Sequence, residues 1–408
     1  MGSSTTEVIH RRFASADGPG NSGEVTFSQS AVETVYLGKT AAGALHQEIC
    51  RASSHRVVMI ASKTLATATT CISGLQQALG DRYAGTFASI PAHSPLDSII
   101  EAVRYVRHCQ ADLLVAVGGG SVIDAAKIVT LCLERDLDAI EDLLALRIGG
   151  QTPDRDYPST RARLQLIAIP TTLSGAEFSD VAAATDHERR QKIGFKHRAL
   201  APRAIILDPA MSLHTPMRLW LSTGVRAMDH AIETLASVRS NSFCDALAES
   251  ALRALATALP ACSRDPESFS ARLECLRAEW QAMIALSGGI PMGLSHAVGH
   301  ALGGSFGVGH GLTSCIAAPA VLAFNQDFDA GKQHRIRTAL GNKRRPAAES
   351  LDRLIRSMDL PRTLGEVGLA AADIPRITEA VLRDPWFHTN PRPLSSADEV
   401  SQFLSTLL

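Results

Sequence analysis

The chain alternates short apolar runs with longer stretches whose apolar residues recur at helical spacing. Residues 57–61 and 112–117 are almost wholly apolar, which is typical of strands buried on both faces. Residues 96–108 carry apolar side chains three and four positions apart, which predicts a helix. Strands that alternate with helices of this length predict a parallel sheet covered on both sides. The same patterns predict an opening strand or hairpin over 24–37, a helix over 65–79, and strands over 164–169 and 204–207.

The pattern changes after Pro209, and from Leu219 onward it is almost wholly helical and rich in Ala and Leu. We therefore expect an α/β domain over 26–208 and an all-helical domain over 209–408. Residues 1–25 are rich in Ser, Gly and charge, which predicts a disordered lead-in.

Composition excludes several classes of protein. With 408 residues, 45% hydrophobic and 20% charged, the chain has the content of an ordinary globular protein. A net charge of −1 gives no electrostatic footprint for nucleic acid or an anionic membrane, and no apolar run is long enough for a membrane helix. The 8 cysteines are dispersed without a C-x-x-C pair, which predicts the reducing cytoplasm.

A glycine-rich turn follows the strand over 112–117. Gly118, Gly119 and Gly120 let the backbone approach a ligand closely, and Ser121 can cap the helix that follows. Strand, glycine turn and helix N-terminus together make a phosphate cradle, because free backbone N–H groups point at the anion. The turn is not the G-x-G-x-x-G fingerprint, so a nucleotide site and a plain turn are both open on these residues alone.

Small hydroxylated residues follow the strand over 164–169. Thr171, Thr172 and Ser174 come directly after it, at the carboxyl end of a strand, where open α/β sheets bind ligands. A plain Ser/Thr turn is the alternative. The order of this segment after the triple glycine favours the site.

Three histidines lie within fifteen residues. His296 and His300 are four apart and share one helix face, and we expect the helix to stop at Gly303-Gly304 before His310. Three imidazoles that converge can bind a divalent metal or move a proton.

A second polar face is predicted on a helix over 222–236. Arg226, His230 and Glu233 share this face, while Asp229 borders it and can pair with Arg226 at i,i+3.

These motifs together resemble the iron-containing (group III) alcohol dehydrogenase family. The resemblance extends from about residue 30 to the C-terminus. It implies a dehydroquinate synthase-like fold, with an α/β nucleotide-binding domain, an all-α C-terminal domain and the active site between them. Within the family the closest resemblance is to maleylacetate reductases, on the segment from Pro170 to Glu177 and on the tail from Thr389 to Pro393.

The resemblance implies a role for each matching position. Gly118, Gly119, Gly120 and Ser121 would hold the pyrophosphate, Asp124 would lie close to the nicotinamide, Thr171, Thr172 and Ser174 would line the cofactor cleft, and Lys192 would be a cofactor-side lysine. His230, His296 and His310 match three metal-ligand positions, and His300 matches a histidine near the nicotinamide.

Two positions depart from the family. Arg226 stands where metal-dependent members have an aspartate ligand, and a fixed cation repels a metal. Ser62-Lys63 stands in the first βα turn, where NAD-preferring members often place an aspartate on the ribose. Without that carboxylate a 2′-phosphate is not repelled, so NADPH should be accepted at least as well as NADH. The alternative for Lys63 is an exposed loop lysine.

The sequence therefore predicts an NAD(P)H-dependent reductase of an oxo-enoate or related carbonyl acid. His296, His300, His230 and Arg226 would be its catalytic residues, and Arg226 would bind an anionic group of the substrate. The alternative is a metal-dependent alcohol dehydrogenase that holds iron or zinc on His230, His296 and His310. A lyase on the related fold and a nucleotide-binding interaction protein are more distant alternatives. The resemblance also implies a homodimer, with no nucleic acid or membrane partner.

Overall fold

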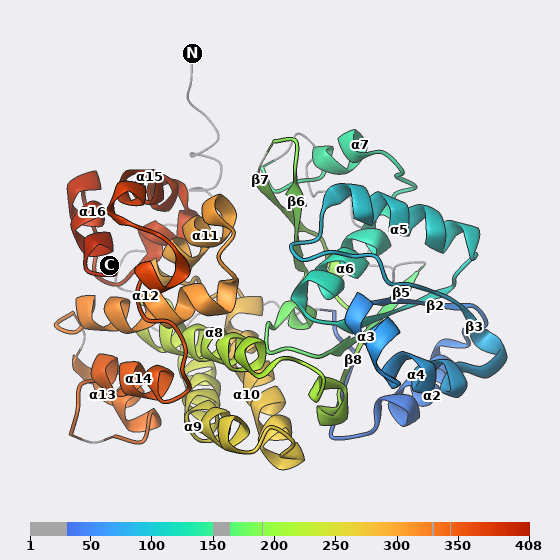
Figure 1. Cartoon of the computed structure of the whole chain (residues 1–408), viewed down its shortest axis with the longest axis horizontal. Helices are drawn as coiled ribbons and strands as arrows, with labels where there is room; N and C mark the ends of the chain where they lie inside the picture. The colour runs from blue at the N-terminus through green and yellow to red at the C-terminus, as the bar shows by residue number, and fades with distance from the viewer. Residues whose placement is uncertain (1–30, 150–163, 190, 329, 343) are drawn as a thin grey trace.

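The computed structural model describes residues 31–149, 164–189, 191–328, 330–342 and 344–408. An α/β half and a helical half lie side by side, with helix α8 along the boundary between them (Figure 1). This confirms the predicted fold class. The expected lead-in over 1–25 lies outside the described residues. None of the described helices is long and apolar enough to cross a bilayer.

A parallel sheet forms the centre of the α/β half. In the described residues its 6 strands lie in the order β1-β8-β5-β4-β2-β3. The strands are β1 (Thr34–Leu37), β2 (Val57–Ala61), β3 (Tyr83–Phe87), β4 (Leu113–Gly118), β5 (Gln165–Pro170) and β8 (Ala204–Leu207). The apolar runs thus form the strands predicted from them, whereas β3 was not predicted. Residues 31–33 before β1 form no strand, and 24–30 lie outside the described residues.

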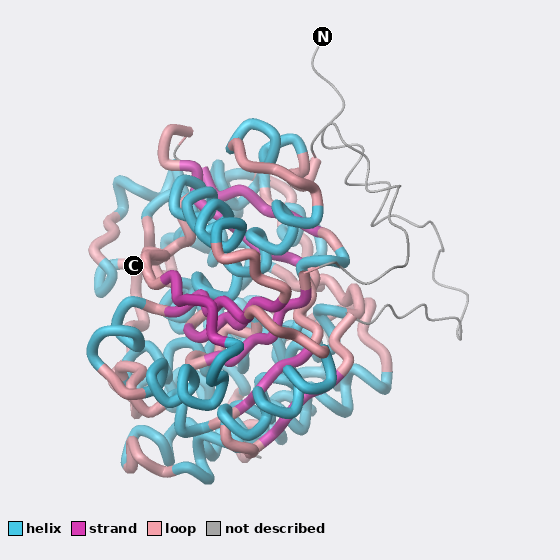
Figure 2. The backbone as a smooth tube through the Cα atoms, turned by 90° about the vertical axis from the view of Figure 1, so that its right-hand side faces the viewer, coloured by secondary structure: helices cyan, strands magenta, loops and turns pink. Residues whose placement is uncertain are grey.

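Helices cover both faces of the sheet, as Figure 2 shows. They are α2 (Ala41–Ala52), α3 (Lys63–Ala68), α4 (Cys71–Leu79), α5 (Leu96–His108), α6 (Gly120–Glu134) and α7 (Ile140–Ala145). Along β2, Val58 and Ile60 pack into one apolar core, while Val57 and Met59 pack into another on the opposite face. This alternation explains why the strand is apolar at every position.

The helix predicted over 65–79 is two helices instead. The chain breaks between α3 and α4 because Thr69 is extended, with φ −139°, and its hydroxyl donates to the Leu65 carbonyl at 2.8 Å. Side-chain hydrogen bonds of this kind compete with the helical backbone pattern.

An antiparallel hairpin, β6 (Val181–Asp186) and β7 (Gln191–Lys196), was not predicted. Its first strand reads Val-Ala-Ala-Ala-Thr-Asp, and alanine gives little strand signal. The hairpin stands above the sheet beside α11 in Figure 1. This position brings Lys192, on β7, to the boundary between the halves.

The helical half begins with a long buried helix. Its helices are α8 (Met217–Ala236), α9 (Ser242–Arg264), α10 (Phe269–Ser287), α11 (Leu294–Phe306), α12 (His310–Phe324), α13 (Ala330–Ala339), α14 (Ala347–Arg356), α15 (Ile374–Arg383) and α16 (Ala397–Ser405). Trp220 and Val225 of α8 belong to the same apolar core as Ile205 and Leu207 of β8. The two halves therefore share a core, which fixes α8 against the sheet.

Helix α11 runs past Gly303-Gly304, so the prediction that it stops there was wrong. It ends at Gly307, whose φ of +70° is the left-handed conformation that glycine adopts at helix ends. Gly303 is needed for packing, because a Cβ there would lie 2.9 Å from Cε1 of His310. The small residue lets α11 and the start of α12 approach each other.

Candidate active site between the sheet and the helical half

The glycine turn joins β4 directly to α6. A Cβ on Gly119 would lie 3.0 Å from Cγ2 of Thr172, and one on Gly120 would lie 3.0 Å from Oγ of Ser174. Contacts this short would force the neighbouring side chain to move. The Thr172–Ser174 segment therefore forms a wall that packs directly against the turn, and the absence of a side chain on the glycines allows this close approach.

Ser121 does not cap α6, contrary to our expectation. The helix begins at Gly120, with Gly119 as its N-cap and no side-chain cap. Ser121 lies in the first turn, where its Oγ accepts a hydrogen bond from the backbone N–H of His93 at 3.0 Å. It fastens the loop after β3 to the start of α6, and the N–H groups of the turn stay available for an anion.

The Thr172–Ser174 segment is the wall that faces the glycine turn, and two of its hydroxyls have no hydrogen-bond partner among the described residues. The Thr172 Oγ1 and Ser174 Oγ atoms are buried without a hydrogen bond among the described residues. Thr171 donates its N–H to the Gly118 carbonyl at 3.0 Å, which ties the wall to the turn. Buried polar atoms without partners usually mark a place for a ligand or water.

Asp124 lies one turn into α6. Its Oδ2 accepts from the backbone N–H of Ala183, on β6, at 3.3 Å. Burial raises the pKa of Asp124, and this is opposed by the charges of Lys127 and Lys192.

His296 is fully buried, and its orientation is fixed by Glu233. Nδ1 of His296 lies 2.7 Å from Oε2 of Glu233, and the Glu233 carboxyl also accepts the backbone N–H groups of Gly293 at 2.7 Å and Ser295 at 2.8 Å. Glu233 thus caps the start of α11 from α8 and orients the imidazole. Nε2 of His296 has no partner among the described residues.

His230 stands beside His296, with ring centroids 4.8 Å apart. Burial holds the pKa of both imidazoles well below its ordinary value, and nearby positive charge, including Arg226, adds to the effect. Both rings are therefore neutral, which suits them to accept a hydrogen bond or bind a ligand through a lone pair.

The pair that borders this cluster, Asp229 and Glu233, is also buried. Burial raises the pKa of each carboxyl to about 7. Asp229 Oδ2 accepts from the hydroxyls of Ser295 and Ser314, each at 2.8 Å. Near neutral pH these two carboxyls carry less negative charge than exposed acids would.

Arg226 is 8% exposed and projects from α8 toward α12. Its NH1 atom donates to Oγ of Ser314 at 3.2 Å, while Asp229 Oδ2 is 4.0 Å away. The alternative was that Arg226 simply forms an ion pair with an acid on its own helix. That ion pair is the one long contact with Asp229. In the described part of the chain the other guanidinium donors have no protein acceptor, so they are available to an anion.

His310 and Lys192 meet across the boundary between the halves. Nζ of Lys192 lies 2.6 Å from Nε2 of His310. Burial lowers the pKa of Lys192, and burial together with the Lys192 charge holds the pKa of His310 well below its ordinary value. The imidazole is therefore neutral, and its Nε2 accepts a hydrogen bond from the amine.

A fourth histidine belongs to a pair that sequence reasoning missed. Nδ1 of His300 lies 2.8 Å from Oδ2 of Asp384, and the indole of Trp386 lies over the imidazole with centroids 4.9 Å apart. A carboxylate on Nδ1 fixes the tautomer and leaves Nε2 to exchange a proton. Asp384 is 84 residues from His300, and no local spacing links them.

Two family models together cover most of the chain. The model for iron-containing alcohol dehydrogenase matches residues 33–209, and the model for the C-terminal part of that family matches 220–408. The chain belongs to the iron-containing alcohol dehydrogenase family. It is accordingly an NAD(P)-dependent oxidoreductase, which agrees with the glycine turn and the partnerless hydroxyls that face it.

Similar proteins include dehydrogenases and reductases. The chain is 32% identical over 378 residues to dehydrogenase FUM7 of Gibberella moniliformis, covering 83% of this chain and 88% of that protein. It is 30% identical over 365 residues to maleylacetate reductase 1 of Cupriavidus pinatubonensis, covering 89% of this chain and 91% of that protein. The crystal structure of a putative alcohol dehydrogenase from Ralstonia eutropha superposes with a TM-score of 0.81 at 28% identity, covering 95% of this chain and 98% of that chain.

The iron of the family name fits this chain poorly. Two cations, Arg226 and Lys192, lie among the predicted ligands, and Lys192 takes Nε2 of His310. Among the described residues, the group of three candidate ligands whose atoms lie within 4.8 Å of one another is Asp229, Glu233 and His296, not the predicted histidine trio. Three of the four carboxyl oxygens of that group already accept hydrogen bonds that hold α11 and α12, whereas Oδ1 of Asp229 accepts none among the described residues. A divalent ion that bound Glu233 would compete with the hydrogen bonds of its carboxyl.

Ser62 and Lys63 lie between β2 and α3, which is the second strand–helix connection and not the first one that we expected. Ser62 is the N-cap of α3 and accepts from the Leu65 N–H at 3.3 Å, while Lys63 is exposed. The amine of Lys63 is thus free to move toward a ligand.

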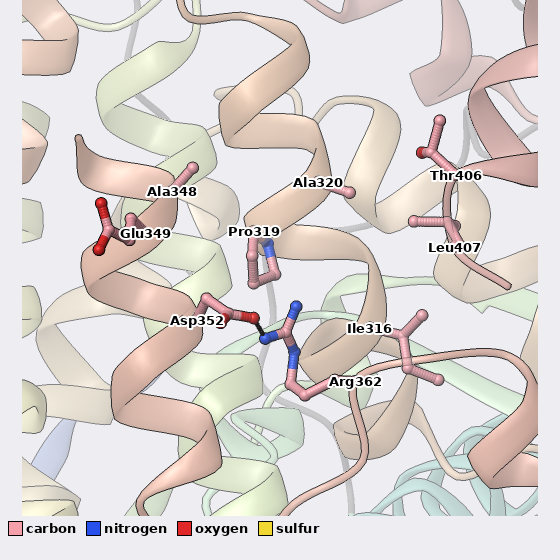
Figure 3. A pocket seen from close by; sticks show the side chains of 9 residues that line it. All are labelled: Ile316, Pro319, Ala320, Ala348, Glu349, Asp352, Arg362, Thr406 and Leu407. Carbon is pink, nitrogen blue, oxygen red and sulfur yellow. Dashed lines mark ion pairs between the residues drawn. The ribbon is translucent and has the colours of Figure 1, made fainter.

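A cavity of about 240 Å³ lies elsewhere, between α12, α14 and the C-terminus. An ion pair between Arg362 and Asp352 crosses it, and Pro319 forms one side (Figure 3). It contains none of the predicted site residues, so we assign it no part in the reaction.

Proposed function

We propose that the chain uses NAD(P)H to reduce an oxo-enoate or related carbonyl acid of the maleylacetate type, without a catalytic metal. The similarity to maleylacetate reductases supports this substrate class. The observation that carries the proposal is the Arg226 guanidinium, which is buried beside the histidines and shares one hydrogen bond with Ser314.

Arg226 binds a substrate carboxylate in this account. A guanidinium and a carboxylate form two parallel charge-assisted hydrogen bonds, worth about 1.5–3 kcal/mol each. The raised pKa values of Asp229 and Glu233 matter here, because carboxyls that hold protons do not neutralise the arginine. Arg226 and Lys192 then supply the positive charge with which the site holds a dianionic acid.

The bound cofactor supplies a hydride. Gly119, Gly120 and the Ser174 hydroxyl would hold its phosphates and ribose, and the histidines would face its nicotinamide end. Hydride addition to the double bond of an oxo-enoate places negative charge on the conjugated carbonyl oxygen. The Lys192 amine, adjacent to His310, is a candidate donor to that oxygen.

A proton must then reach the carbon next to the carbonyl. His300 is better suited to supply it than His296. His296 is fully buried and directs Nδ1 to Glu233, whereas His300 has a partly exposed side chain, a carboxylate partner in Asp384 and a route to solvent for reprotonation. A histidine held by a carboxylate acts well as a general acid.

A metal-dependent alcohol dehydrogenase is the second candidate. Nδ1 of His230 and Nε2 of His296 are buried without hydrogen-bond partners among the described residues, and such nitrogens suit metal ligands. The two candidates separate in one assay. Purified protein is incubated with a chelator, its metal content is measured, and turnover of NADPH is followed with maleylacetate and with a panel of simple aldehydes. We expect turnover of the acid to survive chelation. Turnover of aldehydes alone, abolished by the chelator and restored by iron or zinc, would contradict the proposal.

A further inference from the structure

A pair of buried glutamates connects the cofactor wall to the helical half. Glu279 lies on α10 and Glu177 follows the Thr172–Ser174 segment, and both residues are 0% exposed. The mechanism above uses neither of them. We first describe how they are held, because their surroundings limit the charge that they can carry.

Glu279 holds the turn that follows the wall. Its Oε1 accepts a hydrogen bond from the backbone N–H of Gly175. Gly175 has φ +71°, and a Cβ there would lie 2.5 Å from Cγ of Met283, also on α10. Only glycine fits this conformation and this contact without strain. Helix α10 of the helical half thus fixes the backbone conformation at Gly175 in the α/β half.

Other contacts attach the same helix to the same turn. The Ser287 hydroxyl donates to the Phe178 carbonyl at 2.7 Å, and the ring of Phe178 stacks on Trp280 with centroids 6.2 Å apart. Helix α10 therefore contacts the turn over 175–178 with residues from Glu279 to Ser287. Thr172 and Ser174 precede this turn in the chain, and they lie against Gly119 and Gly120.

The carboxyl oxygens of the pair are poorly satisfied. Both oxygens of Glu177 and Oε2 of Glu279 are buried with no hydrogen-bond partner among the described residues. A buried carboxylate without partners is costly, so such groups keep their protons instead. Burial raises the pKa of Glu177 to about 7, against the pull of the Lys127 ammonium. Burial and the neighbouring Glu177 raise the pKa of Glu279 well above its ordinary value.

Lys127 contributes the nearest positive charge, from α6. Its amine is already committed to the carbonyls of Ala176 and Val181 and to Oγ of Ser179. The charged groups that face the pair or Lys127 are Asp124 and Lys127 on α6 and Asp180 before β6. Asp124 and Asp180 already share the ammonium of Lys127, so these groups offer no further cation to an ionised Glu177.

We propose that Glu279 is a positioning residue for the cofactor wall, and that Glu177 must keep its proton for NAD(P)H to bind tightly. This inference rests on the proposed cofactor cleft. When Glu177 ionises, a negative charge appears in a buried place next to the wall that receives the pyrophosphate. The charge repels the phosphates directly and disturbs the turn that Glu279 holds.

The sign of the pH effect follows from the direction of the shift. A carboxyl whose pKa is raised is neutral in the tight-binding state, so affinity is present at low pH and is lost as pH rises through the raised pKa. With the pKa of Glu177 at about 7, NADPH affinity should fall above neutrality. If binding needs the proton, the dissociation constant rises about tenfold per pH unit there.

The test is an NADPH fluorescence titration across this pH range on the full chain. Wild type should show the alkaline loss of affinity, while Glu177→Gln, which cannot ionise, should show a flat profile. Glu279→Ala should weaken binding at every pH, and Glu279→Gln, which keeps an acceptor for the Gly175 N–H, should restore it. Glu274→Gln is the matched control, since Glu274 lies on α10 and pairs with Arg277 at the surface. This control should titrate like wild type.

Two results would overturn the inference: a Glu177→Gln protein with the wild-type pH profile, or a folded Glu279→Ala protein with wild-type affinity. Circular dichroism and thermal unfolding check that each variant is folded. Gly119→Val separates this inference from the cofactor site itself. If that variant binds NADPH normally, the cleft assignment is wrong and the inference falls with it. If it loses binding while Glu177→Gln behaves as wild type, only the inference fails.

Discussion

Lys192 Nζ lies 2.6 Å from His310 Nε2, and this contact joins the β6–β7 hairpin to the first residue of α12. It places an amine of the α/β half on a nitrogen that the sequence predicts to be a metal ligand. In the proposed function, this contact favours an anion over a cation in the site. Arg226 has the same effect in that proposal.

Removing the Lys192 charge should make the site a better metal site. Lys192→Met keeps the length of the side chain but frees Nε2 of His310, and we expect zinc affinity to rise about tenfold or more, in line with one charged hydrogen bond. Competition with a chromophoric chelator measures this affinity. Lys196→Met, at an exposed position of the same strand, is the control. Equal zinc affinity in wild type and Lys192→Met would argue against the role given to Lys192.

The His300–Asp384 pair should control proton delivery. Asp384→Asn retains an acceptor for the backbone N–H of Trp386 but removes the carboxylate from Nδ1 of His300. We expect kcat to fall about a hundredfold with a small change in KM, because the general acid is misoriented while binding contacts remain. Steady-state kinetics of Asp384→Asn beside Glu379→Gln, a surface acid on α15, measures this. A kcat equal to that of the control would show that another group donates the proton.

Cofactor preference should depend on the connection after β2. Ser62→Asp preserves the N-cap of α3, since aspartate caps helices well. The new carboxylate should repel a 2′-phosphate and raise the KM for NADPH about tenfold while NADH is little affected. Comparing KM values for both cofactors in wild type, Ser62→Asp and Lys63→Met tests the assignment. A wild-type enzyme with a strong preference for NADH, unchanged in Ser62→Asp, would refute it.

The buried carboxyl of Asp229 should lower stability as pH rises toward neutrality, while the buried neutral histidines contribute in the opposite direction. The pKa of Asp229 is raised to about 7, so its contribution to stability is present below the ordinary carboxyl pKa and is lost as pH rises through the raised value. Asp229→Asn cannot ionise, so the change in its Tm from mildly acidic to neutral pH should be more positive than that of wild type by a few degrees, about what 1 kcal/mol gives. Asp142→Asn, at an exposed position on α7, should behave as wild type. An Asp229→Asn protein with the wild-type slope would contradict this.

The strands and the two polar helix faces could be predicted from the sequence because local patterns encode them. Residues 113–118 are buried on both faces of the sheet, so the run is apolar throughout. Arg226, His230 and Glu233 share a face at helical spacing, and the structure brings the last two to His296.

What the sequence could not reveal depends on contacts between distant segments. Asp384 reaches His300 only because α11 packs against α15 and the turn that follows it. Gly303 looked like a helix end, whereas it makes room for His310. Ser121 looked like a cap, whereas its hydroxyl holds His93. In each case the residue type was informative, and the partner that explains it lay elsewhere in the chain.

The measurement that tests the account most directly is the KM of Arg226→Ala for an acidic substrate, taken together with metal content. We expect wild type to turn over without stoichiometric metal. We also expect Arg226→Ala to raise KM for the acid about tenfold to a hundredfold, the loss of a charged hydrogen bond, while Arg218→Ala, at an exposed position on the same helix, leaves it unchanged. An unchanged KM in Arg226→Ala, or a stoichiometric metal required for wild-type turnover, would contradict the account.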